Sequence, residues 1–225
     1  MGWNDWTRGV EIAPSLYAAD FMRLGDQIEA LLAAGCRIFH IDVGDGQFIP
    51  PITIGPIVVQ SVAPAIHQAG GRVDCHLMIV EPERHFEQVR EAGGDSVTFH
   101  VEVCDDVPAT VARARELELG VGIAFNPDTP VETAAAFSTE VDLLLCMSVH
   151  PGYSGQPFLP ESLARLERLR ELAGEDVLLQ VDGGIGAGNV AEAHAAGADV
   201  LVAGSSVFSG GDPAAAYADL VRLAG

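Results

Sequence analysis

Residues 178–203 read LLQVDGGIGAGNVAEAHAAGADVLVA. An apolar run that ends at Asp182 is followed by a glycine-rich turn, an alanine-containing helical segment, Gly197 and a second apolar run. Apolar runs of strand length that alternate with helical segments are typical of parallel strand–helix units. Because a glycine just past a helical segment often caps it, Gly197 marks the expected end of the helix. The stretch therefore predicts one complete strand–helix–strand unit.

The same alternation recurs from Glu11 to the C-terminus and gives eight such units. Most of the predicted strands are apolar throughout, as expected for a sheet that helices cover on both faces. The predicted strands span residues 12–16, 38–43, 73–78, 96–101, 121–125, 143–148, 178–181 and 200–203. Eight units without a reversal of the strand order favour a closed (β/α)₈ barrel, the TIM barrel of the α/β class, over an open doubly wound sheet.

The segments between the predicted strands carry helix signals. After Pro160, an apolar stripe is opposed by arginine and glutamate on the other face, and its members are Leu163, Leu166, Leu169 and Leu172. Like Gly197, three further glycines are expected to cap helices, namely Gly35, Gly93 and Gly120. Residues 10–225 are expected to form one barrel domain. Residues 1–9 are expected to form a dispensable tail whose tryptophans, Trp3 and Trp6, dock on the barrel or on a partner subunit.

Composition excludes several classes of function. A net charge of −20 argues against nucleic acid, because binding a polyphosphate backbone needs cationic side chains. No segment approaches the roughly 18 unbroken apolar residues of a membrane span. The first residues lack the basic and apolar regions of a signal peptide, so we expect a cytoplasmic location. The four cysteines stand singly in apolar runs and are expected to be reduced thiols: Cys36, Cys75, Cys104 and Cys146.

The chain contains no lysine, and all twelve of its cationic side chains are arginines. Sugar-phosphate barrels that form Schiff bases need a lysine amine, and so do those that transfer protons with an Asp-Lys pair. Both chemistries are therefore excluded.

Polar side chains stand at the ends of several predicted strands, where barrels of this type carry their functional residues. His40 and Asp42 are two residues apart, so both side chains point to the same side of their strand. Together with His76 and Asp182 from other strands, they form a set suited to one divalent metal ion. Zinc is the first expectation, with iron, manganese and cobalt as alternatives. His100 and His150, near the mouth of the barrel, could contact these four residues without binding the metal themselves.

Asp42 and Asp182 come from strands that are far apart around the predicted barrel. They could therefore approach a substrate from opposite faces, as stereochemical inversion by proton transfer requires. One would remove a proton next to a carbonyl, the other would return a proton to the far side, and the metal would stabilise the enediolate.

Glycine-rich turns follow the last three predicted strands. They contain Gly152 and Gly155, then Gly183 and Gly184, then Gly204 with Ser205. Barrels of this type bind phosphate at this position with backbone amides, and amides would hold an anion without any cationic side chain. A small phosphorylated substrate is therefore expected despite the acidic surface.

With these segments in view, the chain resembles the ribulose-phosphate 3-epimerases over nearly its whole length. The matching segments are Ile12-Ala13-Pro14-Ser15, Ala19-Asp20-Phe21, His40-Ile41-Asp42, Asp45-Gly46, Thr53-Ile54-Gly55-Pro56, His76-Leu77-Met78, Asn126-Pro127, Met147-Ser148-Val149, Pro151-Gly152, Val181-Asp182-Gly183-Gly184 and Ala203-Gly204-Ser205. The resemblance implies interconversion of D-ribulose 5-phosphate and D-xylulose 5-phosphate. It assigns the metal to His40, Asp42, His76 and Asp182, with the two aspartates as the acid/base pair.

The resemblance also assigns supporting roles. It implies that Ser15 hydrogen-bonds the substrate and that Met78 and Met147 cap the metal site. The phosphate end of the substrate is assigned to Gly152, Tyr153, Ser154, Gly155, Gly183, Gly184, Gly204 and Ser205. We further expect a homo-oligomer, either a dimer or a hexamer.

The chain departs from the family pattern near the site. Gly44 replaces a methionine, Gln47 a histidine, Pro51 an asparagine and Ser154 a glycine, and His150 and Tyr153 are also unusual. An absent side chain at Gly44 would open space above the metal for a longer or differently configured ketose phosphate, such as D-allulose 6-phosphate. A non-catalytic barrel that binds a phosphorylated metabolite is another alternative, although unpartnered buried carboxylates are costly. Metal-assisted aldol cleavage would usually need a lysine, which this chain lacks.

Overall fold

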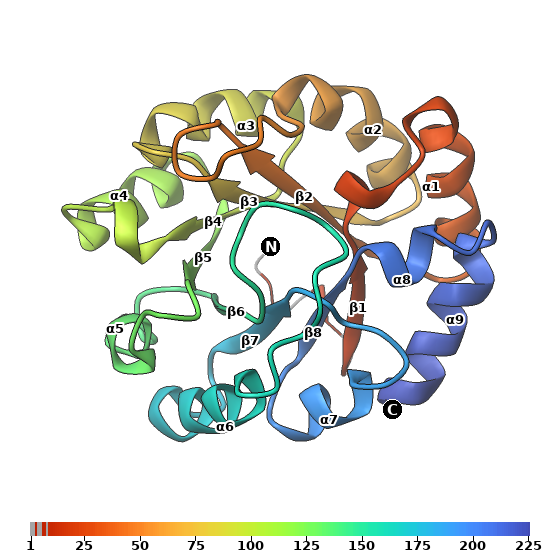
Figure 1. Ribbon diagram of the computed structural model, residues 1–225. Coiled ribbons are helices and arrows are strands. Elements are labelled where there is room, and N and C mark those ends of the chain that lie inside the picture. The colour runs from red at the N-terminus through yellow and green to blue at the C-terminus, as the bar shows by residue number, and fades with distance from the viewer. Residues whose placement is uncertain (1–2, 4–5, 8) are drawn as a thin grey trace.

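Eight parallel strands form a ring that is surrounded by helices (Figure 1). The structure is a computed structural model, and it describes residue 3, residues 6–7 and residues 9–225. The strands are β1 Glu11–Pro14, β2 Ile38–Gly44, β3 Arg72–Met78, β4 Ser96–His100, β5 Gly120–Phe125, β6 Leu143–Met147, β7 Leu178–Asp182 and β8 Val200–Ala203. Each lies within about two residues of its predicted position, so the (β/α)₈ prediction is confirmed.

The ring closes between β1 and β2. Strands pair in the order β1-β8-β7-β6-β5-β4-β3-β2, and a bridge between Ser15 and His40 joins the two ends. Ser15 also donates its backbone N–H to the carbonyl of Ala203, 3.0 Å away. Closure therefore places Ser15 beside the histidine of β2.

The helices cover the outside of the ring (Figure 1). They are α1 Leu24–Ala33, α2 Pro56–Gln68, α3 Phe86–Ala92, α4 Val107–Glu116, α5 Val131–Ala135, α6 Ser162–Ala173, α7 Val190–Ala195, α8 Ser205–Phe208 and α9 Pro213–Ala224. The apolar stripe predicted on α6 is only partly correct. Leu166 and Leu169 are fully buried, but Leu172 is 38% exposed, because four leucines at three-residue spacing drift around a helix with 3.6 residues per turn.

Three of the four predicted glycine caps are confirmed. Gly35, Gly93 and Gly197 have positive φ angles of 100°, 97° and 110°. The prediction for Gly120 is wrong, because Glu118 takes the positive φ angle after α4 and Gly120 is the first residue of β5. A Cβ atom at Gly120 would lie 3.1 Å from Cδ1 of Trp3, so this glycine makes room for the indole.

Trp3 and Trp6 are buried inside the barrel, where the strands begin. They are 1% and 8% exposed, and their rings lie 4.7 Å apart between centroids. They pack with the apolar side chains of the barrel interior, among them Ile38, Leu143 and Val200. Of the two predicted docking places, the structure shows the barrel, and this burial argues against a dispensable tail. Positions 1–2, 4–5 and 8 of the tail lie outside the described residues.

Strand register sets the positions of the polar side chains. His40 pairs with Asp74, and Asp42 pairs with His76. On the other side of the barrel, Met147 of β6 pairs with Asp182 of β7. None of the helices in the described part of the chain has the length and apolar character that crossing a bilayer requires.

Candidate active site

Two histidines and two aspartates meet at the carboxyl end of the barrel. His40 and Asp42 come from β2, His76 from β3 and Asp182 from β7. One ligand atom of each lies within 4.8 Å of the others. Both histidines are fully buried, and Asp42 is nearly so. Imidazole nitrogens and carboxylate oxygens are donors for zinc and related metals, so the cluster could hold a divalent ion.

The Nε2 atom of His40 supports this assignment. It lies 3.2 Å from Oδ1 of Asp42 and 3.9 Å from Oδ2 of Asp182, yet among the described residues it forms no hydrogen bond. A buried ring nitrogen without a partner is costly. A metal ion would use its lone pair, so the residues present fit a divalent metal.

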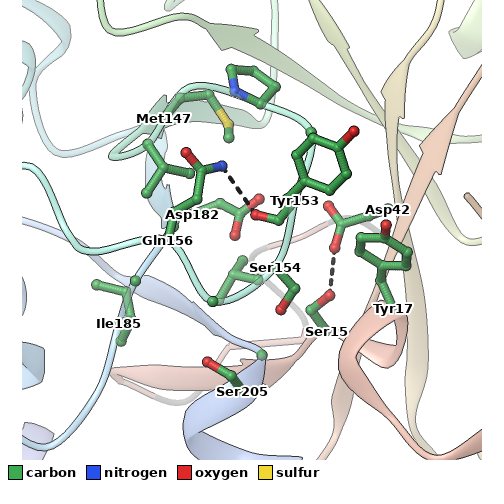
Figure 2. A pocket seen from close by; sticks show the side chains of 18 of the residues that line it. Ser15, Tyr17, Asp42, Met147, Tyr153, Ser154, Gln156, Asp182, Ile185 and Ser205 are labelled. Carbon is green, nitrogen blue, oxygen red and sulfur yellow. Dashed lines mark hydrogen bonds between the residues drawn. The ribbon is translucent and has the colours of Figure 1, made fainter. Parts of the chain in front are cut away.

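The two aspartates face one pocket. Figure 2 shows Asp42 and Asp182 pointing toward each other across it, with Ser15 beside Asp42 and Ser154 nearby. The hydroxyl of Ser15 donates to Oδ2 of Asp42, which fixes the orientation of that carboxylate. The arrangement offers two carboxylates to opposite sides of a small ligand.

A second layer of buried polar groups holds His40 from below. Its Nδ1 atom lies 2.8 Å from Oδ2 of Asp74. Ser96 donates to Oδ1 of Asp74 at 2.8 Å, and Gln180 donates to Oδ2 at 3.0 Å. Asp74, Ser96 and Gln180 are all fully buried. A carboxylate behind a histidine fixes its tautomer and makes it a stronger metal ligand. The sequence analysis missed these residues, although Asp74 is two residues before His76 and therefore shares its face of the strand.

His76 has a different support. Its Nδ1 atom faces the aspartates, 3.1 Å from Oδ1 of Asp42 and 3.5 Å from Oδ2 of Asp182. Its Nε2 atom lies 2.9 Å from Nε2 of His100, whose Nδ1 atom lies 3.2 Å from Oε2 of Glu102. The structure thus places His100 directly behind the cluster. His150 is exposed and lies near Asp128 instead.

The electrostatics of the cluster favour a bound positive charge. Burial raises the pKa of Asp42, but the charge of His40 and the hydrogen bond from His76 outweigh burial and hold that pKa below its ordinary value. Against the effect of burial, Asp42 and Asp74 raise the pKa of His40. His100 behaves differently, because burial lowers its pKa to about 4. The cluster therefore attracts a proton or a metal ion, whereas His100 is neutral at pH 7.

The loop between β6 and α6 crosses the mouth of the barrel (Figure 1). It packs tightly on the turn after β7, where a Cβ atom would lie 2.6 Å from Val149 if built on Gly183 and 2.4 Å from Phe158 if built on Gly184. Both glycines also have positive φ angles. The side-chain amide of Gln156 ties the loop together by donating to the carbonyl of Tyr153 at 3.0 Å (Figure 2).

The predicted substrate-binding residues gather around this pocket. Those that line it are Ser15, Asp42, Met78, Met147, Gly152, Tyr153, Ser154, Gly155, Asp182, Gly183, Gly184, Gly204 and Ser205. His40 and His76 are fully buried and adjoin Asp42 and Asp182 of the pocket lining. Tyr17, Gln156 and Ile185 also line the pocket and were not predicted. Their positions depend on loop conformation, which no local sequence signal gives.

The expectation for Gly44 is wrong. A Cβ atom at this residue would lie 2.5 Å from Cδ1 of Ile49 and 3.1 Å from the carbonyl oxygen of Pro51. Ile49 is only 2% exposed. Its side chain fills the space that an absent methionine would leave, so Gly44 does not open the site to a longer substrate.

Fold and cluster together define a class of protein, a (β/α)₈ barrel enzyme with a possible metal site at its strand ends. Residues 11–208 match the model of the ribulose-phosphate 3-epimerase family. The chain belongs to this family, and its enzyme class is therefore that of the isomerases.

Individual relatives agree with this membership. The chain is 44% identical over 223 residues to a ribulose-phosphate 3-epimerase of Mycobacterium tuberculosis, covering 97% of this chain and 95% of the relative. It is 40% identical over 217 residues to the enzyme of the same name from Synechocystis, covering 94% and 93%. Among solved structures, orotidine 5'-phosphate decarboxylase from Pyrococcus horikoshii has a TM-score of 0.71 at 14% identity, covering 95% of this chain and 98% of that one. That likeness concerns the fold alone.

Proposed function

We propose that this chain is a metal-dependent 3-epimerase that interconverts D-ribulose 5-phosphate and D-xylulose 5-phosphate. The observation that carries the proposal is the pair Asp42 and Asp182, which face one pocket from β2 and β7 directly above two buried histidines. The relatives are named ribulose-phosphate 3-epimerases, which supports a ribulose phosphate as substrate and inversion at C3.

The two aspartates are the proposed acid/base pair. One carboxylate removes the proton from C3, next to the C2 carbonyl, and the other carboxylic acid delivers a proton to the opposite face of C3. In the reverse direction the two residues exchange roles. The hydroxyl of Ser15 holds Oδ2 of Asp42, which leaves Oδ1 on the side of the histidines.

We assign one divalent metal to His40 Nε2, His76 Nδ1, Asp42 and Asp182. The two nitrogens and two carboxylates suit zinc best, with iron, manganese and cobalt as alternatives. When bound, the metal would supply positive charge that stabilises the oxygen atoms of the enediolate. Met78 and Met147, which line the pocket beside this set, exclude water from it.

The phosphate of the substrate is assigned to the side of the pocket formed by residues 152–155, Gly183, Gly184, Gly204 and Ser205. Backbone N–H groups and the hydroxyls of Ser154 and Ser205 can hold a dianion without a cationic side chain. This assignment reconciles an anionic substrate with a chain of net charge −20.

The surroundings of Gly44 give no support to a longer substrate. The side chain of Ile49 fills the space beside Gly44, so the argument for D-allulose 6-phosphate from that space is lost. The five-carbon ketose phosphates remain the best fit.

The test is exchange of the C3 proton of ribulose 5-phosphate with deuterated solvent, followed by NMR. The wild-type protein should exchange this proton, and Asp182→Asn should slow exchange by at least about 10²-fold, the usual contribution of a general base. Chelation of the metal should abolish exchange. Asp176→Asn is the matched control, because it changes an exposed aspartate two residues before β7, and this variant should behave as wild type. Exchange that persists in Asp182→Asn would overturn the mechanism.

We also propose a homo-oligomer, a dimer or a hexamer, in the cytoplasm. The oligomer is supported by large apolar side chains that are exposed on the segments after β1 and β2. Met22 is 93% exposed, Ile52 82% and Ile57 77%. Large apolar side chains that are exposed to solvent are candidates for contact with another copy of the chain.

A further inference from the structure

The contact between His76 and His100 joins two like atoms. Their Nε2 atoms lie 2.9 Å apart, a hydrogen-bonding distance that requires one nitrogen to donate and the other to accept. A neutral imidazole carries one proton and one lone pair, so the choice at this contact decides which nitrogen of each ring is protonated. Both rings are fully buried.

We propose that Glu102 is a positioning residue that sets the proton order of His100 and His76 and thereby presents the lone pair of His76 Nδ1 to the metal. The inference rests on the metal site proposed above. Glu102 touches neither the metal ligands nor the pocket, and it acts through His100.

Metal binding by His76 determines which nitrogen carries the proton in both His76 and His100. If Nδ1 of His76 binds the metal, its single proton must be on Nε2, which then donates to Nε2 of His100. His100 must therefore carry its own proton on Nδ1, and this N–H donates to Oε2 of Glu102 at 3.2 Å. A carboxylate is an obligatory acceptor, so Glu102 is the group that can fix this order from the other end.

The position of Glu102 is itself fixed. Its other oxygen, Oε1, accepts the backbone N–H of Asn126 at 2.7 Å and the hydroxyl of Thr129. Arg165 holds the same segment by donating to the carbonyls of Asn126 at 3.0 Å and Thr129 at 2.8 Å. With Oε1 committed to two donors, Oε2 is directed at His100.

The two histidine ligands are therefore supported in parallel ways. His40 donates from Nδ1 directly to Asp74, so its metal-binding atom is Nε2. His76 uses the opposite nitrogen, and its support reaches a carboxylate only through His100. Which ring nitrogen binds a metal is set by the hydrogen bond of the other nitrogen. This explains why one ligand uses Nε2 and the other Nδ1.

The substitution Glu102→Gln keeps the size of the side chain but removes its negative charge and replaces one acceptor oxygen by an NH₂ donor. The amide oxygen of a glutamine would face Asn126 and Thr129, which donate there, and its NH₂ group would then face His100. His100 would have to accept at Nδ1 and carry its proton on Nε2. The N–H groups at Nε2 of His100 and Nε2 of His76 would then point at each other, and two donors cannot form a hydrogen bond. The tautomer of His76 that binds the metal through Nδ1 would therefore be disfavoured.

The first measurement uses the wild-type protein loaded with Zn²⁺ and labelled with ¹⁵N in histidine. Imidazole ¹⁵N chemical shifts distinguish a protonated nitrogen from one with a lone pair. We expect His76 to be protonated at Nε2 and His100 at Nδ1. A proton on Nε2 of His100 would overturn the proposal, and this result does not depend on any variant folding.

The second measurement is the affinity for Zn²⁺ by competition with a chelator. Removing a group behind a metal ligand typically costs 10–100-fold in affinity, so Glu102→Gln should bind Zn²⁺ about 10–100-fold more weakly, as should Asp74→Asn. Glu116→Gln is the control, because this exposed glutamate lies on α4 and pairs with Arg113. Equal affinity of Glu102→Gln and wild type would refute the role of Glu102. If the wild-type protein bound no Zn²⁺, the metal site itself would be wrong.

Discussion

The side chain of Ile49 occupies the space into which a side chain at Gly44 would project, with its Cδ1 atom 2.5 Å from the position of a Cβ atom. Real Cβ contacts are not this short, so the two positions cannot both carry large side chains in this backbone. Ile49 reaches Gly44 from the loop that follows β2, five residues further along the chain. The pair therefore acts as a single packing unit beside Asp42.

This relationship predicts strong coupling between the two positions. Gly44→Ala alone should lower the free energy of unfolding by about 1–3 kcal/mol through overpacking, and Ile49→Ala alone by about 2–5 kcal/mol through loss of buried volume. In the double variant the costs should not add, and the coupling should be about 0.5–3 kcal/mol. Urea denaturation of the four proteins measures this. Strictly additive effects would show that the residues do not compete for space.

Buried tryptophans at the start of the chain predict that the tail contributes to stability. Trp3→Ala should lower the free energy of unfolding by about 3–5 kcal/mol, the usual cost of removing a buried aromatic ring. Leu172→Ala, which removes an exposed leucine, should change it by less than about 0.5 kcal/mol. Because Trp3 and Trp6 are the only two tryptophans, fluorescence reports their environment directly. If residues 1–9 could be deleted without loss of stability, this interpretation would fail.

Strand positions and the four-residue cluster were predictable because each depends on local pattern. Apolar runs fix the strands, and the alternation of side chains along β2 puts His40 and Asp42 on one face. Parallel strands bring their carboxyl ends to one rim, so polar residues at those ends converge there without further information.

The remaining parts of the site depend on contacts between distant segments. Glu102 follows β4 and gains its role only because Asn126 and Thr129 follow the neighbouring β5. Ile49 fills the space beside Gly44 only because its loop folds back over β2. Asp74 is the exception, since its place two residues before His76 gave a local signal.

Glu102 also predicts a pH dependence of stability. Burial raises its pKa, but the hydrogen bonds from His100, Asn126 and Thr129 outweigh burial and lower it from 4.5 to about 2. A lowered pKa in the folded state means that the unfolded chain binds protons more readily. The contribution of ionised Glu102 to the free energy of unfolding is therefore complete above about pH 4.5 and is lost as the pH falls toward about 2.

We therefore expect that, in the presence of chelator, the free energy of unfolding falls more steeply below about pH 4.5 for wild type than for Glu102→Gln. Denaturation at a series of pH values measures both slopes. Glu140→Gln, at an exposed glutamate, should follow the wild-type slope. Parallel slopes for wild type and Glu102→Gln would show that Glu102 is not the group responsible.

The exposed apolar side chains after β1 and β2 predict where copies of the chain associate. Placing a charge at the centre of an apolar interface leaves it desolvated and unpaired, so Met22→Glu or Ile52→Asp should weaken association at least about tenfold. Sedimentation would then show a species of 23.6 kDa where wild type sediments at a multiple of that mass. Leu172→Asp on α6 should leave the assembly intact, because α6 follows β6 on another side of the barrel. If all three variants kept the wild-type mass, the interface would lie on a different surface, and a wild-type monomer would refute the oligomer itself.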